Sequence, residues 1–154
     1  MGQIKVEHDV NGIKGLCVVE PQVFGDARGY FVETYNYNDF AANGIDVTFV
    51  QDNQSASRRG VLRGLHFQRR HPQAKLLRAL RGSVYDVAVD LRRDSPALGR
   101  AFGILLGAPV LVLVSLAPKS DAMCFVTVGL AAVYLVALYL LIFKLKKKAP
   151  KDEG

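Results

Sequence analysis

The chain has 154 residues, half of them hydrophobic, and a formal net charge of +6, which suits a single domain with its own core. Two cysteines in unlike contexts exclude a disulfide framework and a cysteine-spaced zinc site, so we expect Cys17 and Cys124 to be reduced. The start, MGQIKVEHDV, lacks the basic and apolar regions of a secretory signal, and we expect the N-terminal part to be cytoplasmic.

The first hundred residues consist of short β-branched or alternating runs separated by turns. A turn is predicted at Phe24–Gly29. A short helix is predicted in NDFAANGI, with Asn38 or Asp39 near its start and Asn43-Gly44 at its end. Strands are predicted over Leu16–Val19, Tyr30–Tyr35, Gly60–Gln68, Lys75–Leu80 and Ser83–Arg92, and in VTFVQDNQS, where the strand runs into a polar loop. Many short strands joined by turns favour a sandwich or barrel, so the predicted fold class is mainly β.

The charge pattern changes after residue 100. Residues 1–100 carry 14 Lys and Arg against 11 Asp and Glu, whereas residues 101–143 carry one lysine and one aspartate. Five more lysines lie in the basic tail, residues 144–154, directly after the apolar run. Basic residues in that position are typical of a membrane flank. We therefore predict three parts: a domain over 1–100, an apolar region over 101–143, and the tail.

The apolar region contains two uncharged segments, residues 101–117 and residues 124–143. The second is long enough for a helix to cross a bilayer core of roughly 30 Å, and the first is near the lower limit. Because basic residues flank the pair at both ends, we predict an apolar α-helical hairpin in the membrane, with both flanks on the cytoplasmic side. A pair of buried strands is the alternative for residues 101–117.

A basic stretch runs from Asn53 to Tyr85 without any acidic residue. It contains eight bases: Arg58, Arg59, Arg63, Arg69, Arg70, Lys75, Arg78 and Arg81. A site built from them would suit a phosphate or diphosphate, because arginine can bind phosphate oxygens in a bidentate way. A solvated basic surface is the alternative. We do not expect a nucleic-acid site, since no nucleic-acid-binding motif is present.

His66 stands alone in this stretch, within GVLRGLHFQ. Strict strand alternation predicts Arg63, Leu65 and Phe67 on one face and Leu62, Gly64, His66 and Gln68 on the other. A lone strand histidine is often structural, but a neutral imidazole also suits proton removal beside a carbonyl if a cation such as Lys75 stabilises the enolate. Metal binding is disfavoured, because only His71 accompanies His66 and no carboxylate lies in the stretch.

Three segments carry a family resemblance: PQVFGDARGYFVETYN, FVQDNQSASRRGVLRGLHFQ and HPQAKLLRALRGSVYDVAVDLRRDSPALG. Over about residues 1–105 they resemble the N-terminal part of the dTDP-4-dehydrorhamnose 3,5-epimerases, which act on a sugar nucleotide in rhamnose biosynthesis. The resemblance implies a partial jelly roll (cupin-like, double-stranded β-helix), a homodimer formed through the N-terminal strands, and no metal or organic cofactor.

The resemblance also implies roles for individual residues. His66 would be the general base that removes protons next to the C4 keto group of dTDP-4-keto-6-deoxyglucose, and Lys75 would stabilise the enolate oxygen. The substrate-binding residues would be Arg63 beside the sugar, Arg28, Phe31 and Glu33 reaching the nucleotide across the dimer, and Gln51 and Asn53 contacting the nucleotide or sugar.

The resemblance ends near Gly107. The tyrosine that serves the family as proton donor and the aspartate that orients its base are not found, so we expect weak or absent epimerase activity. Three hypotheses follow: an epimerase homologue with a replaced second half, a membrane-tethered module that binds a nucleotide sugar, and a truncated or fused gene product without function.

Overall fold

A computed structural model describes residues 4–68, 70–107, 111–114 and 123–128. Within these ranges the chain is mainly β, as predicted, with one short α-helix and one short 3-10 helix. The helices are η1 (Val10–Gly12) and α1 (Tyr37–Ala42). The strands are β1 (Ile4–Glu7), β2 (Leu16–Pro21), β3 (Val23–Asp26), β4 (Gly29–Val32), β5 (Leu62–His66), β6 (Lys75–Arg78), β7 (Val84–Asp90), β8 (Ala101–Leu106), β9 (Leu111–Val114) and β10 (Met123–Val128).

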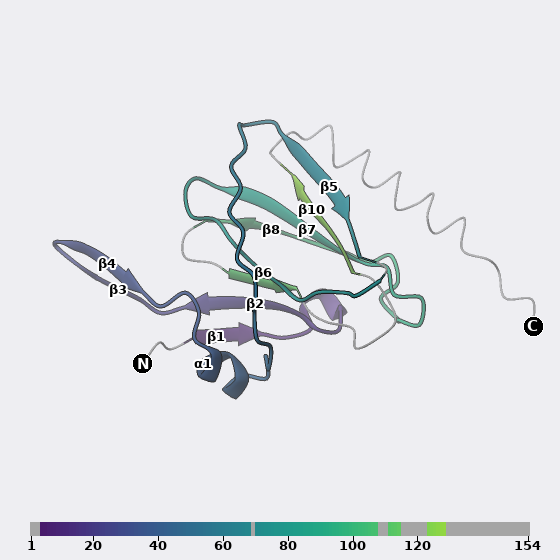
Figure 1. Cartoon of the computed structure of the whole chain (residues 1–154), viewed down its shortest axis with the longest axis horizontal. Helices are drawn as coiled ribbons and strands as arrows, with labels where there is room; N and C mark the ends of the chain where they lie inside the picture. Colours follow the sequence, from purple (N-terminus) through teal and green to yellow (C-terminus); the bar gives the residue numbers. More distant parts are fainter. Residues whose placement is uncertain (1–3, 69, 108–110, 115–122, 129–154) are drawn as a thin grey trace, which may run out of the picture.

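Two four-stranded antiparallel sheets form the two layers of a sandwich (Figure 1). One sheet has the order β1-β2-β9-β6 and the other the order β5-β10-β7-β8. The apolar residues buried between them come from both sheets and the loops beside them: Val10, Ile13, Leu16, Ala88, Ala97 and Leu106. Burial of this cluster from water holds the layers together. The β3–β4 hairpin forms a separate two-stranded ribbon that projects from the sandwich.

The outer face of the first sheet is covered by α1 and the residues after it. Phe40 of α1 and Ile45 are buried against Cys17 and Val19 of β2. The helix begins at Tyr37, one or two residues earlier than predicted, because the Asn36 side chain accepts hydrogen bonds from the backbone N–H groups of residues 38 and 39, at 3.0 and 3.3 Å. Its predicted end at Asn43-Gly44 is confirmed, and Gly44 has the positive φ of a helix terminus.

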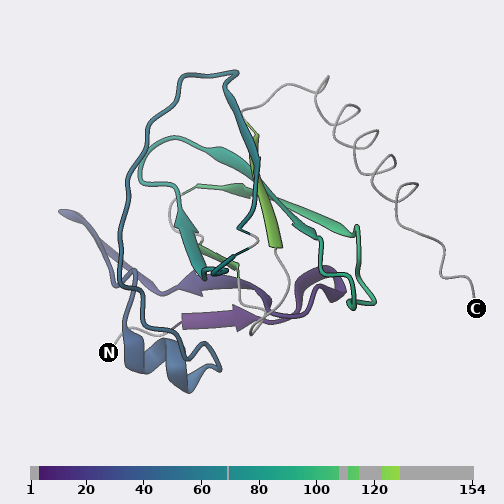
Figure 2. The same cartoon turned by 45° about the vertical axis from the view of Figure 1, so that its right-hand side comes forward.

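Most of the predicted strands are present. Strands lie within the stretches predicted at Leu16–Val19, Gly60–Gln68, Lys75–Leu80 and Ser83–Arg92, and β4 occupies the start of Tyr30–Tyr35. The strand predicted in VTFVQDNQS is wrong, because residues 45–58 run from α1 to the start of β5 without pairing to any strand. Figures 1 and 2 show this segment passing along the outside of the sandwich. The pattern also missed β1, which is an edge strand of the first sheet.

The predicted apolar α-helical hairpin is wrong where the structure describes it. Residues 101–106 and 111–114 form β8 and β9, which confirms strands for the first segment, and β10 includes the start of residues 124–143. Both β9 and β10 are central strands, and strands in that position can be as apolar as a buried helix. Residues 129–143 and the basic tail 144–154 lie outside the described residues. Among the residues that the structure describes, no helix has the length and apolar character needed to cross a bilayer.

A buried carboxylate organises the corner between β7 and β8. Asp90 is fully buried and accepts hydrogen bonds from the Arg92 guanidinium at 2.6 and 2.9 Å, from the Arg92 backbone N–H at 3.0 Å and from the Ser95 hydroxyl at 2.6 Å. Burial by itself would raise the pKa of Asp90, but these hydrogen bonds outweigh it and hold the pKa below its ordinary value. Just before β8, Arg100 donates to the backbone carbonyl of Asn11 at 2.9 Å, which ties this corner to η1.

Candidate functional site

Lys75 lies on the inner face of the first sheet, the face that looks toward the second sheet. Lys75 and Leu16 both pair with Val114, so the two side chains share a face. Leu16 belongs to the cluster between the sheets, and Leu77, two residues along β6, packs against the same cluster. The Lys75 side chain is half-buried and has an interaction partner within the chain. Its ammonium group therefore belongs to the interior face at the edge of the sheet.

Arg63 and His66 share the inner face of the second sheet, which corrects the predicted alternation. Arg63 pairs with Thr127 and His66 with Phe125, but the register shifts between them so that Leu65 is an extra residue. Leu65 packs on the outer face with Val87, whereas Phe125 also pairs with Ala88 of the inner cluster. The shift therefore places His66 and Arg63 on one face, where strict alternation would have separated them.

Asp86 shares this inner face and was not singled out from the sequence. Asp86 pairs with Thr127, as does Arg63, and only 1% of its surface is exposed. A carboxylate at that depth requires a hydrogen-bonding or ionic partner, and Asp86 has an interaction partner within the chain. The available sequence signal was an acidic residue in the middle of an apolar strand, SVYDVAVD. Such a residue is exposed in most edge strands, but β7 is a central strand and Asp86 is buried in it.

The two catalytic candidates lie on edge strands of opposite sheets. β5 is an edge of the second sheet and β6 is an edge of the first, and residues 67–74 connect them. His66 is exposed, so its imidazole is accessible from solvent, whereas Lys75 is half-buried. His66 and Lys75 thus lie on the inner faces of opposite sheets. An imidazole and an ammonium group are the groups that proton removal from carbon beside a carbonyl uses.

Arg63 is anchored to the segment that precedes its strand. Its guanidinium donates to the Ser57 hydroxyl at 2.9 Å and to the Ala56 carbonyl at 3.1 Å. Gln51 and Asn53 lie on the same unpaired segment, are exposed, and are joined by a hydrogen bond of 3.2 Å from Gln51 Nε2 to Asn53 Oδ1. The contact between this segment and β5 is therefore made through Ser57 and Ala56, whereas the hydrogen bond of Gln51 and Asn53 is with each other.

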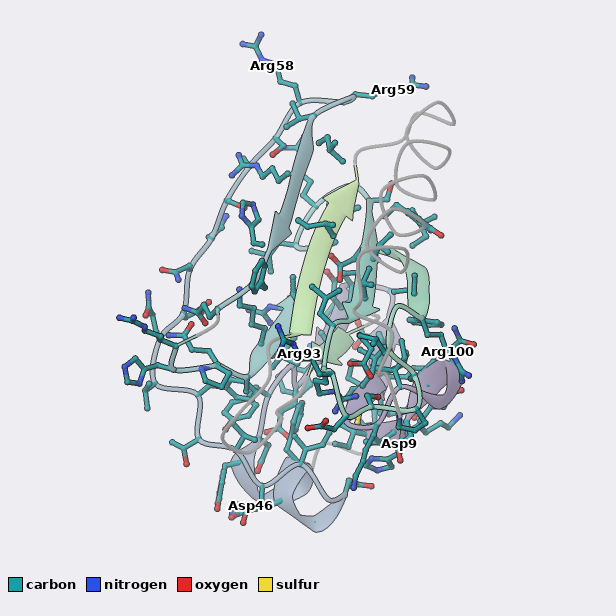
Figure 3. All side chains as sticks on the ribbon, turned by 90° about the vertical axis from the view of Figure 1, so that its right-hand side faces the viewer. Asp9, Asp46, Arg58, Arg59, Arg93 and Arg100 are labelled. Atoms are coloured by element: carbon teal, nitrogen blue, oxygen red, sulfur yellow. The ribbon has the colours of Figure 1, made fainter. Side chains whose placement is uncertain are left out.

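The basic character of the stretch continues to the turn before β5. Figure 3 shows the side chains of Arg58 and Arg59 extending outward from this turn. Both are exposed, and Arg63 follows in the strand itself. Three arginines within one turn and the first residues of β5 create a positive potential at this end of the sandwich, which favours an anionic ligand.

The structure does not bring the other three substrate-binding candidates to this site within one chain. Arg28 and Phe31 belong to the projecting β3–β4 hairpin, and Phe31 is 68% exposed (Figure 1). Glu33 follows β4 and accepts a hydrogen bond from Asn36 Nδ2 at 3.4 Å. Figures 1 and 2 show the hairpin pointing away from β5.

The comparison with known families decides where the chain belongs. A family model described as dTDP-4-dehydrorhamnose 3,5-epimerase matches residues 11–140. The chain belongs to this family. The expected likeness over about residues 1–105 is confirmed, and the match of the epimerase family model continues past Gly107 to include β9 and β10.

Individual epimerases agree with this assignment. The dTDP-4-dehydrorhamnose 3,5-epimerase of Methanothermobacter thermautotrophicus is 55% identical over 94 residues, 61% of this chain and 51% of the relative. The chain thus spans about half the length of such relatives. The epimerase of Bacillus anthracis, solved with TDP and PPi bound, has a TM-score of 0.68 at 35% identity, covering 85% of this chain and 81% of that one.

A third relative was solved with a sugar nucleotide. It is the dTDP-6-deoxy-D-glucose-3,5-epimerase of Legionella pneumophila, in complex with dTDP-4-keto-L-rhamnose. Its TM-score is 0.64 at 32% identity, with 86% of this chain and 75% of that chain covered. The mainly β, cupin-like architecture of this chain is therefore the architecture of the epimerase family.

Proposed function

We propose that the chain binds a dTDP-4-keto-6-deoxy sugar and removes a proton from the carbon next to its C4 keto group. The observation that carries the proposal is the placement of His66 and Lys75 on the facing inner sides of the two sheets. His66 is the general base and Lys75 stabilises the enolate. Membership of the epimerase family supports the choice of substrate class.

The proposed step conserves atoms and charge. The neutral imidazole of His66 takes the proton of the C–H bond, whose electron pair forms a carbon–carbon double bond while C4=O becomes an enolate oxygen. The ammonium group of Lys75 stabilises that oxygen, as a preformed cation does for developing negative charge. Return of a proton to the opposite face of the carbon completes an epimerisation, and return to the same face restores the substrate with a hydrogen from solvent.

We propose that the substrate-binding residues act in two groups. Arg63, Gln51 and Asn53 hold the sugar nucleotide beside β5, and the chemistry of arginine suits its phosphates. Arg28, Phe31 and Glu33 belong to the projecting hairpin and reach the nucleotide bound by a second copy of the chain. A homodimer joined through the N-terminal strands would bring the two groups together. The TDP bound by the Bacillus anthracis relative supports this class of ligand.

We further propose that epimerisation is slower than proton exchange. The resemblance assigns the second proton transfer to a tyrosine, and the tyrosines after residue 107, Tyr134 and Tyr139, fall in the apolar run, outside the described residues. A base without an acid on the opposite face exchanges protons but inverts the carbon rarely.

The experiment is incubation of the purified chain with dTDP-4-keto-6-deoxyglucose in D2O, followed by NMR. We expect deuterium to enter at C3 or C5 while the epimerised product accumulates more slowly. Equal rates of exchange and epimerisation would contradict the slow second step. An absence of both, in a preparation that binds dTDP, would contradict the reaction and leave a binding protein.

A further inference from the structure

Asp26 and Arg28 form a closed network of hydrogen bonds at the tip of the β3–β4 hairpin. Asp26 and Gly29 are paired, so the turn consists of Ala27 and Arg28. The Asp26 carboxylate accepts the Arg28 backbone N–H at 2.8 Å, Arg28 Nε at 3.1 and 3.3 Å, and Arg28 Nη2 at 2.6 Å. One carboxylate therefore fixes both the turn and the side chain that it presents.

These contacts occupy one edge of the Arg28 guanidinium and fix its orientation. The guanidinium carries its N–H donors in a rigid planar fork, so holding Nε and Nη2 fixes where the Nη1 end points. The Arg28 side chain is 90% exposed, and in the described contacts Nη1 is not bonded to the hairpin. The free end is thus presented to an anion that lies outside the ribbon.

An aromatic pair lies next to this arginine. Phe24 and Phe31 are directly opposite each other in the two strands and are 51% and 68% exposed. Asp26 is two residues beyond Phe24 and therefore on the same face of the ribbon. Exposed rings beside a directed guanidinium match the chemistry of a nucleoside diphosphate, with a base that stacks and phosphates that accept hydrogen bonds.

We propose that Asp26 is a positioning residue, which orients Arg28 toward a phosphate of the nucleotide without touching the ligand itself. The inference rests on the proposed function, in which Arg28 binds dTDP. The hydrogen bonds from Arg28 also hold the pKa of Asp26 below its ordinary value, which favours the charged carboxylate. The alternative is that Asp26 is only a turn residue in a surface ion pair, and such a pair contributes little to stability.

The test is a double-mutant cycle on ligand binding, measured by calorimetry with dTDP and with thymidine. We expect Asp26→Asn to weaken dTDP binding about fivefold to tenfold, because the directed charge-assisted contact is lost. Thymidine lacks phosphates, so its affinity should be unchanged. In an Arg28→Ala background, Asp26→Asn should have no further effect, and Asp26→Glu should recover part of the dTDP affinity.

Asp94→Asn is the matched control, since Asp94 is exposed and its loss changes the net charge equally. Tighter dTDP binding by Asp26→Asn would overturn the proposal, because Asp26 would then compete with the phosphate. An equal loss for thymidine, or in the Arg28→Ala background, would assign Asp26 a merely structural role. If the unchanged chain binds no dTDP, the proposed function itself fails, and the Arg28 Nε–H signal in NMR still reports whether Asp26 orders the side chain.

Discussion

Arg63 of β5 and Asp86 of β7 occupy one row across the second sheet, because both pair with Thr127 of the strand between them. His66 and Ala88 occupy the next row on the same face through Phe125. The inner face of this sheet therefore carries an imidazole, a guanidinium and a buried carboxylate.

We expect Asp86→Asn to slow deuterium exchange by about tenfold or more, because it removes a buried charge from the inner face that also carries Arg63 and His66. The measurement is the exchange rate in D2O at neutral pH, with Asp94→Asn as the control, since Asp94 is exposed. Exchange by folded Asp86→Asn at the rate of the unchanged chain would mean that Asp86 does not serve the reaction.

The role of Lys75 in the reaction can be separated from a general effect of charge on β6 by a variant on the opposite face of the same strand. Lys75→Gln should slow exchange by about 100-fold or more, since a preformed cation no longer stabilises the enolate. Arg78→Gln is the matched control, because Arg78 pairs with Leu111 in the row of Val19, on the outer face. Comparable losses in the two variants would indicate a general effect of charge rather than a role for Lys75.

The Asp90 corner predicts a stability that depends on pH. Asp90→Asn should lower the free energy of unfolding by about 3 kcal/mol at pH 7, because it disrupts a buried ion pair. The folded pKa lies below the ordinary 3.8, so the contribution is complete above that value and is lost as the pH falls through the folded pKa. The free energies of unfolding of the two proteins, measured with urea, should therefore converge in acid. A difference in unfolding free energy that stays constant down to strongly acidic pH would contradict the assignment of this stability to the charged Asp90 carboxylate.

Gly103 of β8 is required by the side chain packed across it. A Cβ at Gly103 would collide with the hydroxyl and the ring carbon Cζ of Tyr85. We expect Gly103→Ala to destabilise the fold by about 1–3 kcal/mol, as overpacking does. Gly107→Ala is the control, because a Cβ there meets no atom within 4 Å. Thermal unfolding measures both, and recovery of stability by Tyr85→Leu in the Gly103→Ala chain would identify the collision as the cause.

The sequence was informative where local pattern and tertiary position agree. The alternation in SVYDVAVDLR predicts β7, and its two faces pack into two different clusters, with Ala88 inward and Val87 outward. The family motifs also identified His66, Lys75 and Arg63, which the structure places on facing inner surfaces. The roles of these residues came from the resemblance, because periodicity cannot distinguish a catalytic histidine from a structural one.

The errors have physical causes that no local pattern reveals. The face of His66 depends on the extra residue Leu65, and a register shift leaves no mark on an alternation of residue types. Residues 111–114 were assigned to a helix because an uncharged apolar run fits either a membrane helix or a central strand. Whether the strand has neighbours on both sides is decided by distant segments.

The most direct measurement is deuterium incorporation into dTDP-4-keto-6-deoxyglucose by the unchanged chain, His66→Asn and His71→Asn. His71 is the matched control, since it is exposed in the same basic stretch and its positive φ tolerates asparagine. We expect His66→Asn to slow exchange by about 100-fold or more while dTDP binds with the same affinity, and His71→Asn to exchange normally. Exchange by His66→Asn at the rate of the unchanged chain would contradict the assignment of His66 as the base.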